Sequence, residues 1–265
     1  MADRDYKAFI VEGEVREPQI IDNISKVFFA HGDFKIITLP AEENIYMLWK
    51  KLKEDDFDTD IIEVLRESND VIREQLTGLS RDDFSEVYLF FDYDIHQTNL
   101  RKEDDADAVA QMLESFDNET ENGKLYISYP MVEALRDYNS DVCGNKEACY
   151  VSIEQMTEYK NASSVRSANP GLKYTYEIWK EIIDVFAMRV SCLFGSVDTL
   201  EYERYSETAR PYDIYVQEEK KRQKGRVFVL SAFPEFLVDY YGAKLWRICV
   251  KHKKNQRKIQ GCRSE

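Results

Sequence analysis

The sequence predicts an α/β protein whose first half builds a mostly parallel sheet and whose second half is rich in helices. Up to about residue 140, short apolar runs alternate with stretches of helical spacing, which is typical of βαβ units. The run Val87–Phe91 is apolar throughout, as expected for a central parallel strand covered on both faces. Beyond about residue 140 long helical patterns dominate. We therefore expect an α/β domain over residues 1–140 and a helix-rich region with a basic tail over 141–265.

The elements of the first half follow in order. Ala8–Val11 indicates the first strand, and Pro18 suits the first position of the helix after it. The run "KIITLP" predicts a second strand, and apolar residues then recur at helical spacing over about 41–80. The acidic stretch "EDDFDTD" divides this helical insertion into two predicted helices.

The central strand is followed by a predicted helix over about Glu103–Phe116 and by a fourth strand in "GKLYISYP". Pro130 then opens a predicted helix in "PMVEALRDY". In the second half, "CYVSI" indicates a short strand, Ile178–Leu193 a strongly buried helix, and "GRVFVLSAF" a strand that leads into another helix.

Composition limits the classes of protein that fit. With 43% apolar residues the chain of 265 residues can bury a core, and no run approaches the roughly 20 apolar residues of a membrane span. The first residues lack the pattern of a secretory signal, and the five cysteines form no CxxC pair. A reduced, cytoplasmic setting without membrane attachment is the expectation.

Charge is distributed unevenly along the chain. The net charge is −14, yet residues 220–265 carry 13 Lys and Arg against three acids. The basic tail is either a solvated chain end or a surface for a phosphate backbone or an acidic partner. The candidate binding residues in it are Lys251, Lys253, Lys254, Arg257 and Lys258.

Acidic residues follow two of the predicted strands. Glu12 comes after the first strand, and Asp92 and Asp94 come after the central one. The carboxyl ends of parallel strands meet at one edge of a sheet, so these three carboxylates should converge there. Their mutual repulsion is relieved by a divalent cation, and oxygen ligands without His or Cys favour Mg²⁺ or Mn²⁺. The alternative is an ordinary pair of acidic loops.

The two motifs resemble those of Toprim domains. "FIVEGEVREP" is similar to the first Toprim motif, a strand followed by Glu-Gly, and "YLFFDYD" is similar to the second, a strand followed by Asp-x-Asp. The string "EGEVREP" also resembles the start of RloB-like proteins, relatives of the OLD nucleases, with Arg16 where that group usually has Thr. "SYPMVEALRDY" resembles a later helix of the group, in which Glu133 matches an acid and Val132 replaces an aromatic residue. The resemblance covers roughly residues 6–138.

The resemblance implies a Rossmann-like fold and a metal-dependent endonuclease acting on DNA or RNA, including tRNA. Glu12 is then a metal ligand or general base, Asp92 and Asp94 hold one Mg²⁺ or Mn²⁺, and Glu17 or Glu133 helps to hold a second ion. Lys124 is a candidate stabiliser of the charge that develops in the transition state.

The same resemblance implies the partners. OLD-like nucleases usually carry an ABC-type ATPase, but this chain has no GxxxxGK[ST] motif. Stand-alone proteins of this type resemble effectors of bacterial anti-phage defence and abortive infection that work with a separate ABC-type ATPase. A homo-oligomer is left open.

Two other functions fit parts of the sequence. HAD-type phosphotransferases begin with a motif close to "YLFFDYDIHQT", with Asp92 as nucleophile, although His96 stands where Thr or Val is expected and two strands precede the motif. The other alternative is a non-catalytic interaction module that binds a metal or a nucleotide at the same acids.

Overall fold

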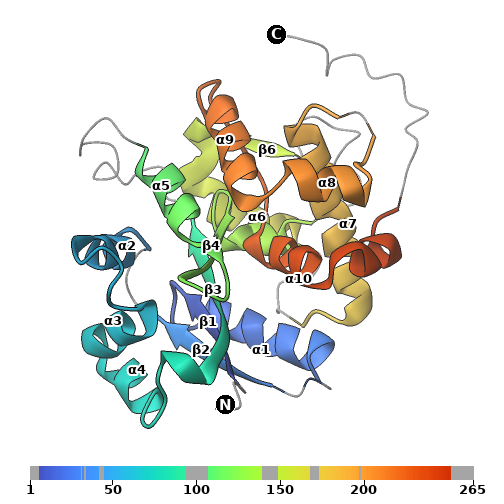
Figure 1. The fold of residues 1–265 in the computed structure, drawn as a ribbon. Helices are drawn as coiled ribbons and strands as arrows, with labels where there is room; N and C mark the ends of the chain where they lie inside the picture. Colours follow the sequence, from blue (N-terminus) through green and yellow to red (C-terminus); the bar gives the residue numbers. More distant parts are fainter. Residues whose placement is uncertain are drawn as a thin grey trace. The chain divides into compact units, whose positions relative to one another are not determined.

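The computed structural model (Figure 1) describes residues 6–30, 32, 34–41, 45–93, 107–138, 149–167, 173–196 and 198–251. The chain divides into two compact units, one ending at Tyr126 and the other beginning at Ile127. This division falls earlier than the boundary expected near residue 140. None of the described helices is both long and apolar enough to cross a bilayer.

The first unit is built on a sheet whose five strands lie in the order β2-β1-β3-β5-β4. The strands are β1 (Tyr6–Val11), β2 (Lys35–Pro40), β3 (Phe84–Asp92), β4 (Asp117–Asn118) and β5 (Gly123–Ser128). β1 runs parallel to both β2 and β3, whereas the short β4 pairs antiparallel with β5. The α/β class with mainly parallel central strands is therefore as the sequence predicts, and β4 is an addition that no sequence pattern indicated.

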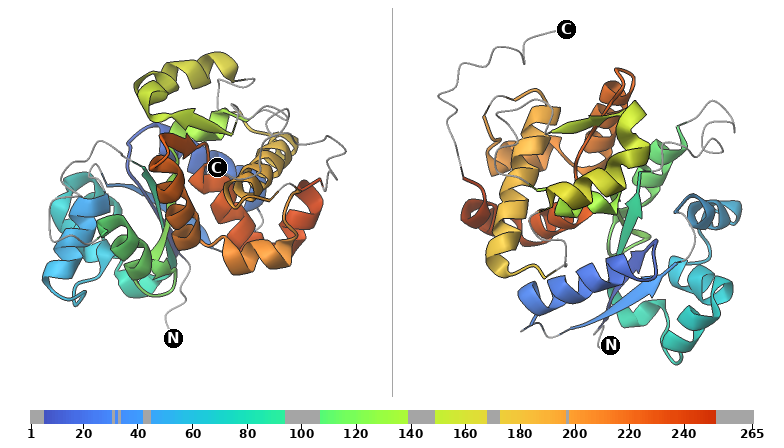
Figure 2. Two further views of the ribbon diagram at one scale, coloured as in Figure 1. Left: turned by 90° about the horizontal axis from the view of Figure 1, so that it is seen from above. Right: turned by 180° about the vertical axis from the view of Figure 1, so that it is seen from behind.

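Helices cover both faces of this sheet (Figure 2). One face carries α1 (Arg16–Phe28), and the other carries α2 (Ile45–Glu54), α3 (Ile61–Ser68), α4 (Asp70–Gln75) and α5 (Ala108–Ser115). The central strands are accordingly apolar on both faces, and Ala8 to Val11 are completely buried. A hydrogen bond of 3.2 Å from the Trp49 indole to the Ser115 hydroxyl joins α2 to α5.

The helical insertion forms three helices, where the sequence predicted two. Asn69 has an extended backbone (φ −139°, ψ 118°), which ends α3, and its side chain accepts hydrogen bonds from the amides of Val71 and Ile72 at 2.9 and 3.1 Å. One asparagine thus ends one helix and caps the next. A cap of this kind is hidden in a continuous helical pattern of apolar residues.

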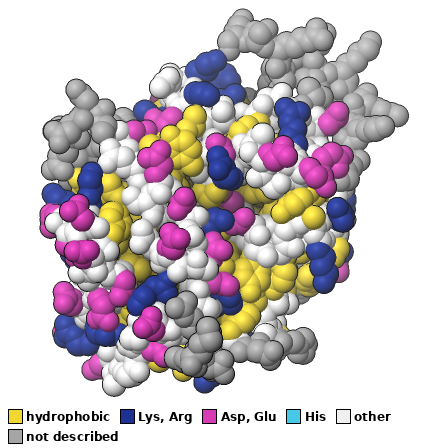
Figure 3. Space-filling model, in the orientation of Figure 1, with side chains coloured by type: hydrophobic (Ala, Val, Ile, Leu, Met, Phe, Trp, Pro, Cys, Tyr) yellow, Lys and Arg dark blue, Asp and Glu magenta, His cyan; other side chains and the backbone are white. Residues whose placement is uncertain are grey.

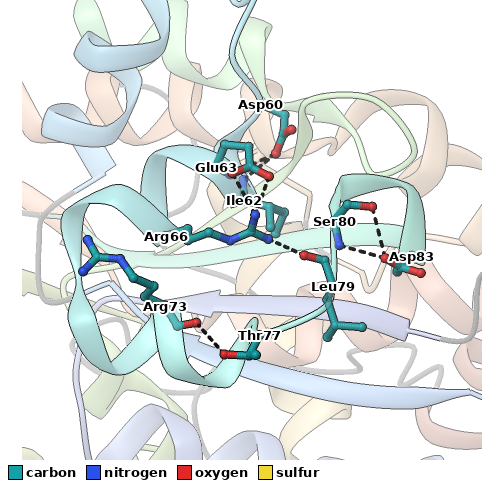
Figure 4. A network of polar contacts seen from close by, with 9 residues as sticks. All are labelled: Asp60, Ile62, Glu63, Arg66, Arg73, Thr77, Leu79, Ser80 and Asp83. Carbon is teal, nitrogen blue, oxygen red and sulfur yellow. Dashed lines mark hydrogen bonds and ion pairs between the residues drawn. The ribbon is translucent and has the colours of Figure 1, made fainter.

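A polar network joins α3 to the segment that precedes β3 (Figure 4). Asp60 caps α3 by accepting from the amides of Ile62 and Glu63 at 2.8 and 3.1 Å. Arg66 donates to both carboxylate oxygens of Glu63, at 2.8 and 2.9 Å, and also to the carbonyl of Leu79. These contacts fix the segment that leads from the insertion into the central strand.

The second unit is mainly helical. Its described residues form the 3₁₀ helix η3 (Val132–Arg136), a two-stranded antiparallel sheet and five α-helices. The two strands are β6 (Tyr150–Ser152) and β7 (Arg226–Phe228), and η6 (Ile153–Gln155) follows β6. The helices are α6 (Met156–Arg166), α7 (Tyr176–Leu193), α8 (Tyr202–Thr208), α9 (Pro211–Arg222) and α10 (Ala232–Cys249).

Two predicted helix starts are wrong. α1 begins at Arg16, so Pro18 is the third helical residue and not the first. The segment after Pro130 forms the short 3₁₀ helix η3, where an α-helix was predicted. All five residues of η3 are buried and no side chain caps its start, so packing against the unit's core rather than helical propensity defines this turn.

Candidate functional site

Glu12 and Asp92 lie together at one edge of the sheet. Glu12 follows the last residue of β1, and Asp92 is the last residue of β3. Because the two strands pair in parallel, with Val11 opposite Phe90, both side chains emerge at the carboxyl edge. The backbone amide of Asp92 donates a hydrogen bond of 3.2 Å to Oε2 of Glu12. Both residues are half-buried, at the boundary between the core and solvent.

A third carboxylate folds back over the same loop. Glu17 lies in the first turn of α1 and is only 8% exposed. A Cβ atom added at Gly13 would lie 2.7 Å from Oε2 and 3.0 Å from Oε1 of Glu17. Position 13 therefore has no room for a side chain while Glu17 keeps this conformation.

This contact explains the glycine of the Glu-Gly motif in an unexpected way. The φ of Gly13 lies outside the left-handed region, so its backbone conformation does not require a glycine. What the glycine supplies is space for the Glu17 carboxylate. The first turn of α1 also carries the positive end of the helix dipole, which favours a carboxylate at this position.

The described carboxylates fit a hard cation in their chemistry, but they do not complete a site. Among the described residues, no three His, Cys, Asp or Glu side chains are grouped so that they could hold a metal ion. Asp94, the third predicted ligand, lies outside the described residues, as does His96. The described part of the site thus supplies carboxylate oxygens only, which is the donor type that Mg²⁺ and Mn²⁺ prefer.

Glu133 belongs to the second unit. It lies in η3 and is 3% exposed, and an oxygen of its carboxylate is 3.7 Å from the Lys160 ammonium. This ion pair joins η3 to α6 within the unit. The ion pair with Lys160 gives Glu133 a structural role within the second unit. Its role in metal binding stays a prediction.

Lys124 lies at the start of β5, away from the carboxyl edge. The neighbouring Gly123 packs against Val87 and Leu89 in the middle of β3. The backbone of Lys124 is therefore level with the middle of the central strand, and its ammonium is 6.0 Å from the centre of the Tyr126 ring. The predicted role of Lys124 in stabilising the transition state stays a prediction.

The predicted basic tail is described only at its beginning. Lys251 is exposed, and its backbone amide donates a 2.8 Å hydrogen bond to Oδ1 of the buried Asp184 in α7. This bond holds the end of α10 against α7. Lys253, Lys254, Arg257 and Lys258 lie outside the described residues.

Sequence reasoning missed a buried polar network in the second unit. Arg189 of α7 donates to the carbonyls of Asp137 and Val229 at 2.7 and 3.0 Å. The Tyr159 hydroxyl donates to the Asp137 carboxylate at 3.1 Å, and so joins α6 to the same network. The signal for it was an arginine within the apolar run "DVFAMRVSCLF", where a charge needs buried partners.

Comparison with known proteins adds no relative. The chain matches no family model, no curated protein and no solved structure. Its function is therefore argued from the two motifs and from the geometry of the carboxyl edge.

Proposed function

We propose that the chain is a nuclease that hydrolyses phosphodiester bonds with Mg²⁺ or Mn²⁺ held at the carboxyl edge of the sheet. The observation that supports this best is the hydrogen bond from the Asp92 amide to Oε2 of Glu12. It brings together the two acidic motifs, which are 80 residues apart and which also carry the resemblance to Toprim domains. The buried Glu17 adds a third carboxylate to the Glu12 loop.

The residues divide the work as follows. Asp92 and Asp94 would hold the metal, and Glu12 would either complete its coordination or accept the proton of the attacking water. The Asp92 amide orients the Glu12 carboxylate for this task. Glu17 and Glu133 are candidates for holding a second ion from the resemblance. One bound metal ion, or two, would activate the attacking water and stabilise the leaving oxygen of an in-line displacement.

The substrate, the biological setting and the partner are inferred from the resemblance to Toprim nucleases. We propose an endonuclease that acts on DNA or on RNA such as tRNA, in the cytoplasm. Its proposed setting is bacterial anti-phage defence by abortive infection, with a separate ABC-type ATPase as partner.

The test is cleavage of plasmid DNA and tRNA by the purified chain in Mg²⁺, in Mn²⁺ and in EDTA. We expect cleavage with the metals and none with EDTA. Glu12→Gln keeps the shape of the side chain and should lower the rate at least about 100-fold, as expected for loss of a general base. Glu14→Gln is the matched control, because Glu14 is an exposed neighbour in the same loop.

The same assay addresses the two alternatives. If neither substrate is cut in any metal, alone or with the partner ATPase, a non-catalytic interaction module replaces the nuclease. If a phosphate mimic such as beryllium fluoride traps a covalent-like adduct at Asp92, a HAD-type phosphotransferase replaces it, because a Toprim nuclease forms no aspartyl intermediate.

A further inference from the structure

The end of α9 and the turn into β7 concentrate positive charge on the second unit. The segment "QEEKKRQKGR", residues 217–226, contains five bases and two acids. Lys220, Lys224 and Arg226 are exposed, and Lys221 is half-buried. In Figure 3 dark blue side chains gather at the top of the view, over the outer end of α9. These residues lie within the basic segment 220–265, but they are not among the candidate binding residues predicted near its end, Lys251 to Lys258.

Both acids of this segment are buried or paired. Glu218 is 1% exposed and accepts a 3.1 Å hydrogen bond from the Phe228 amide, and burial raises the pKa of its carboxyl well above the usual range. Glu219 is held by Arg222 through contacts of 2.8 and 2.7 Å. The side chains of Lys220, Lys224 and Arg226 are exposed, whereas the acids of the segment are buried or held by Arg222.

One face of the β6–β7 sheet carries two aromatic residues, the half-buried Tyr150 and the buried Phe228. Tyr150 is opposite Phe228 and Ser152 is opposite Arg226, so these four residues share one face. The Arg226 guanidinium is 4.9 Å from the centre of the Tyr150 ring, and the Lys221 ammonium is 5.9 Å from that of Phe228. The opposite face, with Val151 and Val227, packs toward the core of the unit. Cations are thus held over both aromatic rings of this face, and of the two rings Tyr150 is the one that is partly exposed.

The turn between α9 and β7 is fixed and open. Gly225 has a φ of +74° and accepts a 3.1 Å hydrogen bond from the Ile153 amide. A Cβ atom at Gly225 would meet no atom within 4 Å, so the turn stands free of neighbouring side chains. The residue after Ile153 is Glu154, an exposed acid. A ligand can approach the turn while the lysines and Arg226 stay in place.

The geometry points to this surface as a binding site for the phosphate backbone of a nucleic acid, made by Lys220, Lys221, Lys224, Arg226 and Tyr150, which we call the α9–β7 surface. A chain with a net charge of −14 repels polyanions as a whole, so binding one requires a local patch of this kind. The inference rests on the proposed nuclease function for its substrate class, and it names residues outside the catalytic edge that would hold that substrate.

The test is binding of fluorescent tRNA and of a short DNA duplex by the full chain carrying Glu12→Gln, in EDTA, so that no cleavage is needed. The test variant adds Lys220→Gln, Lys224→Gln and Arg226→Gln. The matched control adds Arg204→Gln, Lys244→Gln and Arg247→Gln, which remove the same charge from exposed positions on α8 and α10. Circular dichroism and thermal unfolding establish that both variants fold.

We expect the test variant to bind at least about tenfold more weakly at low salt, and the control to bind like its parent. Between about 50 and 200 mM salt, the log of the binding constant falls as log [salt] rises. The magnitude of this slope should be smaller by about two to three in the test variant. Equal binding by the test variant and its parent, equal loss in both variants, no binding by the parent, or equally tight binding of poly-glutamate would each overturn the inference. Binding as expected, combined with absence of cleavage in every metal, would instead overturn the proposed nuclease and leave this surface as a nucleic-acid-binding site.

Discussion

The backbone amide of Asp92 donates a hydrogen bond to Oε2 of Glu12, across the parallel pair formed by β1 and β3. This contact joins the ends of two strands that lie far apart in the sequence. The backbone of Asp92 orients the carboxylate of Glu12. The relative position of the two acids therefore depends on the register of the sheet rather than on flexible loops.

Gly13→Ala should disturb the site through Glu17. The new methyl group would lie 2.7 Å from Oε2 of Glu17, so the carboxylate at the end of this side chain has to move. We expect weaker metal binding together with a small fall in the free energy of unfolding. Glu17→Gln alone measures the contribution of the Glu17 charge.

A double-mutant cycle over these two positions checks the mechanism. If Gly13→Ala acts only by moving Glu17, its effect on metal affinity should be much smaller in a Glu17→Gln background. Additive effects of the two substitutions would show that Gly13 acts through the backbone of the loop instead.

Glu218→Gln should change how stability depends on pH. Burial raises the pKa of Glu218 in the folded chain, so the folded state keeps a proton that the unfolded state loses once the pH exceeds its ordinary pKa. This group therefore contributes no pH dependence in acid, and it lowers the stability as the pH rises between the unfolded and the folded pKa. The glutamine variant retains an acceptor for the Phe228 amide and cannot ionise.

The stability of the Glu218→Gln variant relative to the parent should rise with pH above about 4.5, by up to about 1.4 kcal/mol per pH unit. Urea unfolding at a series of pH values measures this difference. A constant difference from pH 4 to pH 8 would mean that Glu218 is ionised in the folded chain.

Arg189→Met should destabilise the second unit strongly. The guanidinium satisfies the buried carbonyls of Asp137 and Val229, and methionine leaves both without this donor. We expect a loss of about 3–5 kcal/mol, combining the unsatisfied carbonyls with the lost packing. Denaturant unfolding followed by the intrinsic fluorescence of tryptophan measures it.

Lys180→Met in the same helix is the control for Arg189→Met. Lys180 pairs with Glu177 at 3.0 Å on the surface of α7, and such pairs contribute less than about 1 kcal/mol. Equal losses from the two substitutions would contradict the structural role assigned to Arg189.

The sequence predicts the centre of the first unit well, because strong local patterns determine it. The apolar runs before Glu12 and Asp92 can only be buried strands, and parallel pairing then brings the two acids to one edge. Contacts that depend on a single side chain were not predictable in this way. The cap by Asn69 divides a continuous helical pattern, and the fit between Gly13 and Glu17 appears only when α1 is placed against the loop.

The second unit was harder to predict for a different reason. α9 has a mostly polar sequence and few apolar positions to indicate its buried face, yet it packs against β7 through Glu218 and Phe228. Polar contacts of this kind have no periodic signature. The charge of residues 217–226 is visible in the sequence, but the burial of Glu218, the pairing of Glu219 and the aromatic neighbours appear only in the structure.

Calorimetric titration of the chain with Mn²⁺ and with Mg²⁺ is the most direct test of a metal site at Glu12 and Asp92. We compare the parent with Glu12→Gln, with Asp92→Asn, and with the exposed control Glu14→Gln. We expect the parent and Glu14→Gln to bind the metal ions, and we expect Glu12→Gln and Asp92→Asn to lose at least about tenfold in metal affinity. Equal metal binding by all four chains, or no binding by the folded parent, would contradict a metal site at Glu12 and Asp92.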